Sequence, residues 1–85
     1  MTQVLIYGRT NCHWCEKALD MARQYGIDCE YRNVLHNEEW KQELLEALPD
    51  CKTVPQIFWH GNHVGGYEDF ATEIENTRTY GDGQV

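Results

Sequence analysis

The strongest restriction on the fold comes from a strand-like segment that is followed, within a few residues, by a helix-like one. Residues 3–7 form a mostly apolar run without alternation, which is typical of a strand covered on both faces. After a loop over residues 8–11, the apolar spacing over residues 12–25 predicts a helix that ends at Gly26. This succession indicates the α/β class. The residues expected on the inner face of the helix are Trp14, Ala18, Met21, Ala22 and Tyr25.

Two cysteines, Cys12 and Cys15, occupy the first turn of this predicted helix. A sulfur there faces unpaired backbone N–H groups and the positive end of the helix dipole, and both favour thiolate over thiol. Because the two residues are one turn apart, the pair can attack a foreign disulfide, hold it as a mixed disulfide and release the product. A structural half-site for zinc is the alternative, although the sequence has no second cysteine pair with this spacing.

Length and charge narrow the possible functions. The 85 residues have room for one domain, 1–85, and a net charge of -7 at pH 7 argues against nucleic acid or an anionic membrane as partner. No apolar run approaches the roughly 18 residues of a membrane span, and the first residues do not resemble a secretory leader. We therefore expect a cytoplasmic protein in a reducing compartment, where disulfides are transient and catalytic.

The middle of the chain repeats the strand and helix pattern. Residues 28–34 read as a second strand, and Asn37 is a suitable N-cap for a helix that Pro49 ends. A right-handed crossover would make the first two strands parallel. The inner face of the second helix is expected to contain Trp40, Leu44, Ala47 and Leu48.

A hairpin and a helix are predicted for the last part of the chain. The hairpin begins with a strand within residues 53–59, after Pro55, and turns at Gly61-Asn62 into a strand at residues 63–64. A helix over residues 67–77 follows, and residues 78–85 form a frayed tail. The inward residues of that helix are expected to be Phe70, Ala71 and Ile74. The order βαβαββα predicts a mixed four-stranded sheet flanked by three helices, with ligands gathering near the loop before Cys12.

Three ordered motifs carry a family resemblance. They are Cys12-His13-Trp14-Cys15, Thr53-Val54-Pro55-Gln56-Ile57-Phe58 and Gly65-Gly66-Tyr67-Glu68-Asp69-Phe70, with Gly8-Arg9 upstream. Over residues 4–74 the chain resembles a glutaredoxin, specifically the small dithiol type of bacteria and their phages. The resemblance implies a thioredoxin-like fold, glutathione as electron donor, no tightly bound cofactor, and reduction of protein disulfides and glutathione mixed disulfides. Ribonucleotide reductase is one protein partner that it suggests.

Roles for individual residues follow from the same resemblance. It implies that Cys12 is the nucleophile, that Cys15 is the resolving thiol, and that Val54-Pro55 is a cis peptide whose Val54 backbone pairs with the cysteinyl part of glutathione. Asp69 would pair with the γ-glutamyl amine, and Arg9 with the glycyl carboxylate. The other residues implied to line the glutathione site are Trp14, Thr53, Pro55, Gly66, Tyr67 and Glu68.

The chain departs from the family pattern at three places. His13 and Trp14 stand where proline and tyrosine are usual, and a protonated His13 is expected to stabilise the Cys12 thiolate. Trp14 keeps an aromatic wall but cannot act as an acceptor in place of a phenol. Glu68 adds a negative charge near the expected carboxylate site, which opposes glutathione binding unless the side chain turns outward.

Two alternatives of other classes stay open. One is an iron–sulfur carrier in which Cys12 and glutathione bridge a cluster between protomers. The other is a thioredoxin-like reductase that a flavoprotein recharges. Otherwise we expect a monomer without a metal site. Cys29 and Cys51 are interpreted as packing or surface thiols, and His60 and His63 as solvated turn residues.

Overall fold

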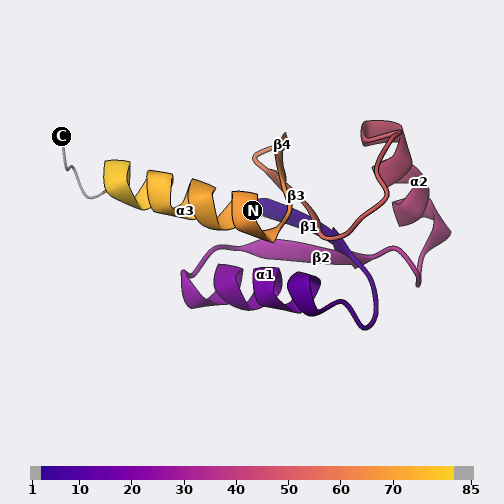
Figure 1. Ribbon diagram of the computed structural model, residues 1–85, viewed down its shortest axis with the longest axis horizontal. Coiled ribbons are helices and arrows are strands. Elements are labelled where there is room, and N and C mark those ends of the chain that lie inside the picture. The colour runs from indigo at the N-terminus through magenta and orange to yellow at the C-terminus, as the bar shows by residue number, and fades with distance from the viewer. Residues whose placement is uncertain (1–2, 82–85) are drawn as a thin grey trace.

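The computed structural model describes residues 3–81, with side chains described through residue 76. Strands and helices follow one another in the predicted order, βαβαββα (Figure 1). Their bounds are β1 Val4–Gly8, α1 His13–Gln24, β2 Cys29–Asn33, α2 Glu38–Ala47, β3 Gln56–Trp59, β4 Asn62–Gly65 and α3 Tyr67–Gly81.

The four strands form one mixed sheet in the order β2-β1-β3-β4. Strand β1 pairs with β2 in parallel and with β3 in antiparallel fashion, and β4 is antiparallel to β3. Both the parallel first pair and the antiparallel hairpin confirm the sequence prediction. The arrangement places β1 in the interior of the sheet, so the loop that leaves its carboxyl end starts from a strand paired on both sides.

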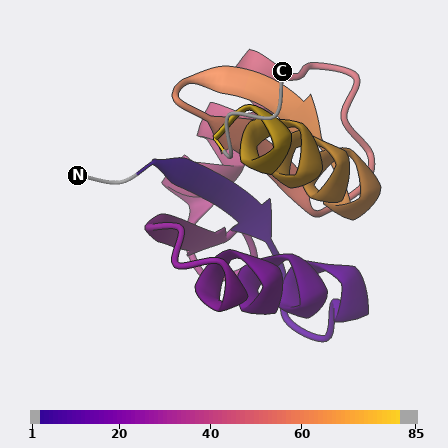
Figure 2. The same ribbon diagram turned by 90° about the vertical axis from the view of Figure 1, so that its left-hand side faces the viewer.

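One face of the sheet is covered by α1 and α3, which contact each other and lie side by side in Figure 2. The side chains between them and the sheet are fully or almost fully buried and apolar, which is the packing that contributes most to stability in a domain of this size. This core consists of Val4, Ile6, Ala18, Ala22, Ile57, Phe70 and Ile74.

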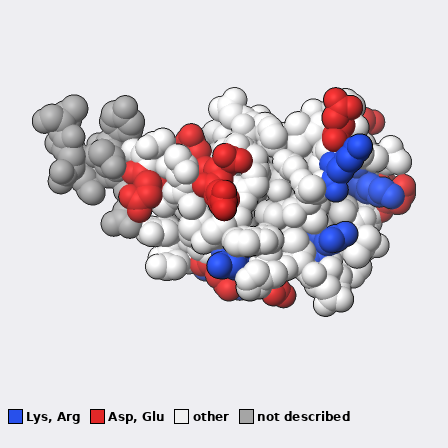
Figure 3. All heavy atoms as spheres, viewed as in Figure 1, with Lys and Arg blue, Asp and Glu red and all other residues white. Residues whose placement is uncertain are grey.

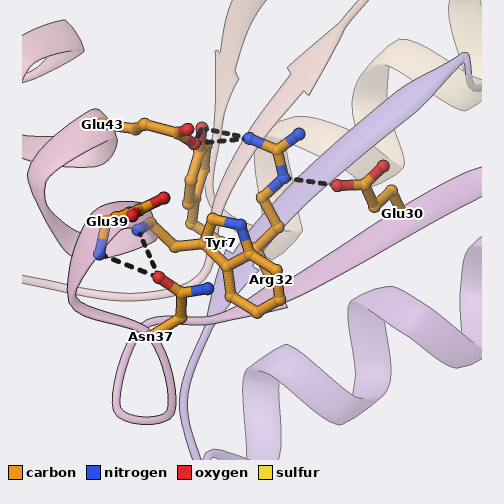
Figure 4. Close-up of polar contacts among 7 residues, drawn as sticks. Tyr7, Glu30, Arg32, Asn37, Glu39 and Glu43 are labelled. Carbon is orange, nitrogen blue, oxygen red and sulfur yellow. Dashed lines mark hydrogen bonds and ion pairs between the residues drawn. The ribbon is translucent and has the colours of Figure 1, made fainter.

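Helix α2 lies against the other face, at the opposite end of the long axis from the end of α3 (Figure 1). Successive side chains of a strand point to opposite faces, so Tyr7 points away from the core that holds Ile6. On that side the Tyr7 hydroxyl donates to Glu43 of α2, and the Arg32 guanidinium contacts both Tyr7 and Glu43, as Figure 4 shows. Polar contacts between side chains therefore tie α2 to β1 and β2.

The predicted inner face of α1 is wrong at both ends of the helix. Cys15, Ala18 and Ala22 are buried, whereas Trp14 and Tyr25 are 48% and 37% exposed. Tyr25 is the C-cap and no longer has helical backbone, and Trp14 in the first turn packs on Tyr67 instead of on the sheet. Helical periodicity holds where the sheet lies beneath the helix and fails where the helix ends.

In α2 the predicted N-cap is confirmed, because the Asn37 side chain accepts hydrogen bonds from the backbone N–H groups of Glu39 and Trp40 (Figure 4). Of the predicted inner face, Leu44 is buried, Trp40 and Leu48 are half-buried, and Ala47 is exposed. Only the part of α2 that meets the sheet is therefore buried.

The hairpin turn lies one residue earlier than predicted. His60 and Gly61 have φ values of 53° and 83°, and Trp59 pairs with Asn62, so His60-Gly61 forms the two-residue turn. Helix α3 continues to Gly81, four residues past the predicted end at Thr77, and buries Phe70 and Ile74 as expected. The rest of the predicted tail, residues 82–85, lies outside the described residues. Within residues 3–81, no helix is both long and apolar enough to cross a membrane.

Candidate functional site

The two cysteines of the first motif form a disulfide at the start of α1, with their Cα atoms 5.2 Å apart. Cys12 is the N-cap, and its sulfur accepts a hydrogen bond from the Cys15 backbone N–H at 3.2 Å. Cys12 is 8% exposed, whereas Cys15 has no exposed surface. Of the two residues, only Cys12 therefore keeps any exposed surface, and its sulfur lies at the helix end that favours a negative charge.

The loop that carries Cys12 is held in place by the end of β2. The Tyr31 hydroxyl donates to the Arg9 carbonyl, and its ring passes so close to Gly8 that a Cβ there would lie 2.3 Å from the hydroxyl oxygen. The Asn33 side-chain amide donates to the Thr10 hydroxyl at 3.0 Å. Sequence reasoning missed both Tyr31 and Asn33, because these contacts join residues far apart in the chain.

The segment before β3 lies beside the disulfide. The Val54-Pro55 peptide is cis, as the resemblance implied. The Val54 carbonyl oxygen is 3.8 Å from the Cys12 sulfur. The polar main-chain atoms of Val54 therefore lie next to the Cys12 sulfur.

A groove of about 380 Å³, which we call the Trp14 groove, opens on this side of the disulfide. Eight of the nine residues expected to bind glutathione line it; the exception, Arg9, lines a neighbouring groove that shares Thr53 and Val54 with the first. Sequence reasoning missed Gln56, which follows the cis proline directly. The lining of the Trp14 groove is Trp14, Thr53, Val54, Pro55, Gln56, Gly66, Tyr67, Glu68 and Asp69.

An aromatic wall forms one side of the Trp14 groove. The Trp14 and Tyr67 rings lie 5.4 Å apart between centroids, and the Lys17 ammonium lies 4.9 Å from the Trp14 ring and 5.5 Å from the Tyr67 ring. Such an ammonium stabilises the paired rings by cation–π attraction. The exposed His13 ring touches Trp14 from the other direction, with 5.6 Å between centroids. The expected wall is therefore present, and it is built from two helices.

Acidic side chains and backbone N–H groups meet at the start of α3. The Asp69 carboxylate accepts a hydrogen bond from the Gly66 N–H at 3.3 Å, which caps the helix. Gly65 has a φ of 128°, and a Cβ there would lie 2.3 Å from Asp69, so only glycine fits. Gly66 lies close to the Pro55 carbonyl instead, 3.8 Å from where its Cβ would be. Asp69 and Glu68 are both exposed and free to meet a cationic group.

The remaining cysteines and histidines are not part of the disulfide, although Cys51 lines the same neighbouring groove as Arg9. Cys29 is half-buried in β2, and burial raises the pKa of its thiol. Cys51 is also half-buried, and its sulfur lies 3.3 Å from the Thr53 carbonyl oxygen. His60 is a turn residue, as interpreted, whereas His63 lies within β4 and contacts Gln56 at 2.8 Å.

Comparison with known proteins gives consistent matches. A family model described as glutaredoxin matches residues 4–64. Glutaredoxin 1 of Escherichia coli K12 is 37% identical over 79 residues, which are 86% of this chain and 93% of that protein. Glutaredoxin-1 of ectromelia virus is 31% identical over 85 residues, with 94% of this chain and 78% of that protein covered.

Solved structures agree with this match. Reduced glutaredoxin of Escherichia coli is similar with a TM-score of 0.74 at 32% identity, covering 88% of this chain and 95% of that one. A buckwheat glutaredoxin–glutathione complex also has a TM-score of 0.74, at 19% identity, covering 88% and 70% of the two chains. The second likeness concerns the fold alone. Together they confirm the predicted thioredoxin-like fold.

Proposed function

The chain belongs to the glutaredoxin family and is a thiol–disulfide oxidoreductase; from this premise we propose that Cys12 is its attacking sulfur, Cys15 its resolving sulfur and glutathione its electron donor. The observation that carries the proposal is the difference in exposure between the two cysteines at one helix end. Cys12 keeps 8% of its surface exposed, while Cys15 is fully buried one turn further on.

The surroundings of Cys12 favour its ionised form after reduction. The Cys15 N–H already points at the Cys12 sulfur at 3.2 Å, and further first-turn N–H groups and the helix dipole favour a negative charge there. A low thiol pKa raises the thiolate fraction near neutral pH and makes the Cys12 sulfur a better leaving group when a free glutathione removes the glutathionyl group from it. The exposed His13 next to it would add to this effect when protonated.

With a protein disulfide, two exchanges lead to products. The Cys12 thiolate attacks one substrate sulfur, a mixed disulfide forms, and the other substrate sulfur leaves as a thiolate that takes a proton. The Cys15 thiolate then attacks Cys12, which releases the second substrate thiol and leaves the Cys12–Cys15 disulfide. Two glutathione molecules reverse this: the first forms a mixed disulfide with Cys12, and the second removes it as glutathione disulfide.

With a glutathione mixed disulfide, Cys12 is sufficient. Its thiolate takes the glutathionyl sulfur, the substrate thiol leaves, and a free glutathione then releases glutathione disulfide. Cys15 takes no part in this route. The two routes therefore differ in their need for the second cysteine.

The Trp14 groove and its neighbour fit the proposed donor. The backbone of Val54 would pair with the cysteinyl part of glutathione, Asp69 with the γ-glutamyl amine and Arg9 with the glycyl carboxylate. Trp14, Thr53, Pro55, Gly66 and Tyr67 would complete the walls. Glu68 also lines the groove, so its carboxylate opposes the γ-glutamyl carboxylate at close range.

Disulfide-containing proteins are the proposed substrates, with ribonucleotide reductase as one candidate. We also propose that the protein works as a monomer in the cytoplasm. The likeness to glutaredoxin 1 of Escherichia coli supports disulfide-containing proteins as the substrate class.

Cysteine variants in a coupled assay test the function. Turnover is followed with glutathione, glutathione reductase and NADPH, using a protein disulfide and a glutathione mixed disulfide as substrates. Cys12→Ser should abolish both activities, whereas Cys15→Ser should lose the first and keep the second. Cys29→Ala, which removes a thiol of β2 that lines neither groove, is the control and should keep both.

Three outcomes would contradict the proposal. Activity retained by Cys12→Ser would remove the assigned nucleophile. Turnover with thioredoxin reductase but not with glutathione would show that glutathione is not the electron donor. A coloured, iron-containing protein after anaerobic purification would support a carrier role instead.

A further inference from the structure

A second groove lies next to the disulfide, on the side away from the aromatic wall. We call it the α2 groove; it measures about 330 Å³ and is lined by Arg9, Leu35, Lys41, Leu45 and Lys52 together with the Thr53-Val54 backbone. It shares Thr53 and Val54 with the Trp14 groove, and the Val54 carbonyl oxygen is 3.8 Å from the Cys12 sulfur. A chain whose disulfide lies at Cys12 can therefore extend directly into it.

Three cations converge on the α2 groove in a molecule that is acidic overall, with a net charge of -7. Among the six Lys and Arg side chains in the described part of the chain, Arg23 and Arg32 form ion pairs and Lys17 lies on two rings. Arg9, Lys41 and Lys52 have no such partner within residues 3–76. Figure 3 shows the basic side chains gathered at the α2 end, with acidic ones around them.

Two large apolar side chains accompany these cations. Leu35 is 64% exposed and Leu45 is 37% exposed, and both line the α2 groove. Exposed leucines beside unpaired cations form a surface that is both apolar and positively charged. A segment that combines carboxylates with an apolar side chain complements it.

The Trp14 groove has a charge opposite to that of the α2 groove. Glu68 and Asp69 line the Trp14 groove, and no Lys or Arg does. Charge therefore changes sign across the disulfide, from positive at Lys41 and Lys52 to negative at Glu68 and Asp69. An acidic flank is attracted on one side of Cys12 and repelled on the other, which selects one direction for the bound chain.

We propose that the α2 groove docks the segment next to the disulfide of a protein substrate, and that this segment is acidic and carries an apolar side chain. The proposal rests on the proposed function, because it adds a substrate class to the same Cys12 site. Of the residues that line this groove, the proposed glutathione site uses Arg9, Thr53 and Val54, so Lys41, Lys52 and the two leucines are left for a larger substrate. At physiological ionic strength the Debye length is about 8 Å, so distant carboxylates are screened while these cations act at contact.

Peptides of matched sequence test the proposal. Each contains one internal disulfide with Glu-Leu-Glu, Gln-Leu-Gln or Lys-Leu-Lys on one side and Gly-Ser-Gly on the other, and is made in both orders. Reduction is followed with glutathione, glutathione reductase and NADPH, and peptides are compared in the order that is reduced faster. We expect kcat/KM for the acidic peptide to exceed that of the neutral one by about tenfold, mainly through KM, and the basic peptide to be slowest.

Charge-reversal variants test whether the α2 groove causes the preference for the acidic peptide. Lys41→Glu should remove the advantage of the acidic peptide over the neutral one. Arg23→Glu, which makes the same change of charge on α1, should keep it, because Arg23 lies outside both grooves. If Lys41→Glu does not fold, Lys52→Glu tests the same groove from the loop before β3.

The outcomes separate the two proposals. Equal, measurable rates for the acidic and neutral peptides would overturn the docking proposal and leave the oxidoreductase function intact. No reduction of any peptide would overturn the proposed dithiol route itself, and the docking proposal with it. Arg23→Glu could also lose the preference for the acidic peptide to the same extent as Lys41→Glu. The preference would then come from the net charge of the protein, and the docking proposal would be overturned.

Discussion

The two faces of the sheet are built differently. Towards α1 and α3, the sheet contributes Val4, Ile6 and Ile57 to a core without exposed surface. Towards α2, Phe58 is only half-buried and Tyr7 ends in a polar contact with Glu43. An open groove of about 490 Å³ remains on that face, lined by Leu5, Tyr7, Phe58 and Ala47 among others.

This difference shows how stability and substrate contact are divided in the molecule. The helix that carries Cys12 lies on the apolar face, where burial of apolar surface holds it. The helix that carries Lys41 and Leu45 buries Leu44 alone, and its contacts with Tyr7 and Arg32 are polar and partly exposed, which makes them weak in water. The segment that carries Cys12 is thus held by the core, whereas we expect α2 to be less stable and able to adjust to a partner.

The largest expected effect comes from removing an aromatic side chain on each face. Phe70→Ala should lower the free energy of unfolding by about 3–5 kcal/mol, because Phe70 is fully buried. Phe58→Ala should cost about 1–2 kcal/mol, because Phe58 already faces an open groove. Urea unfolding monitored by far-UV circular dichroism measures both.

If Phe70→Ala does not fold, leucine substitutions allow the same comparison of the two faces. Phe70→Leu should still cost more than Phe58→Leu. Equal losses at the two positions would show that the α2 face is packed as tightly as the other.

An intermediate effect is expected from the polar contacts of α2. Glu43→Gln removes the charge that meets Arg32 and should lower the free energy of unfolding by about 0.5–1 kcal/mol, because both side chains are partly exposed. Hydrogen exchange of the α2 amides should speed up more than that of α1. Glu46→Gln, an exposed change on the same helix, is the control and should stay within about 0.5 kcal/mol. An equal change in exchange over α1 and α2 would mean that the two faces open together.

The smallest effect concerns alkaline pH. Burial raises the pKa of the Cys29 thiol above 9.0 and of the Tyr7 and Tyr31 hydroxyls above 10.0. The folded state therefore prefers the neutral groups, so their contribution to stability is complete below pH 9 and is lost as pH rises through the raised pKa values.

Urea midpoints of the oxidised protein from pH 7 to 11 should thus fall above pH 9. Cys29→Ala, on the α1 face, should remove the part of the decrease in midpoint that begins at the lowest pH. Tyr7→Phe, on the α2 face, should remove a part that begins at higher pH. A midpoint that rises between pH 9 and 11 in the wild type would contradict the assigned direction.

Local signals in the sequence predicted much of this structure. Asn37 as an N-cap and the order of strands and helices along the chain were predicted correctly, because capping and apolar spacing act over a few residues. The inner face of α1 was predicted wrongly at Trp14 and Tyr25, because periodicity does not say how far the sheet extends. The hairpin was placed one residue late, because Gly61-Asn62 is the more usual turn pair and only the pairing of Trp59 with Asn62 decides otherwise.

The same contrast applies to the site. The cysteine pair and the cis Val54-Pro55 peptide follow from short motifs, and most of the residues that resemblance suggested line one groove. Tyr31 and the cations of the α2 groove did not stand out, since none of them belongs to a motif.

The amino-acid sequence alone determined the class of fold, the helix start at Cys12 and the chemistry of its sulfur, because each depends on neighbours within one helical turn or one strand. Tertiary structure decided which sulfur is accessible, where Val54 meets it, and that Arg9, Lys41 and Lys52 converge on one groove. Such contacts join segments tens of residues apart, and only the packing of helices on the sheet brings them together.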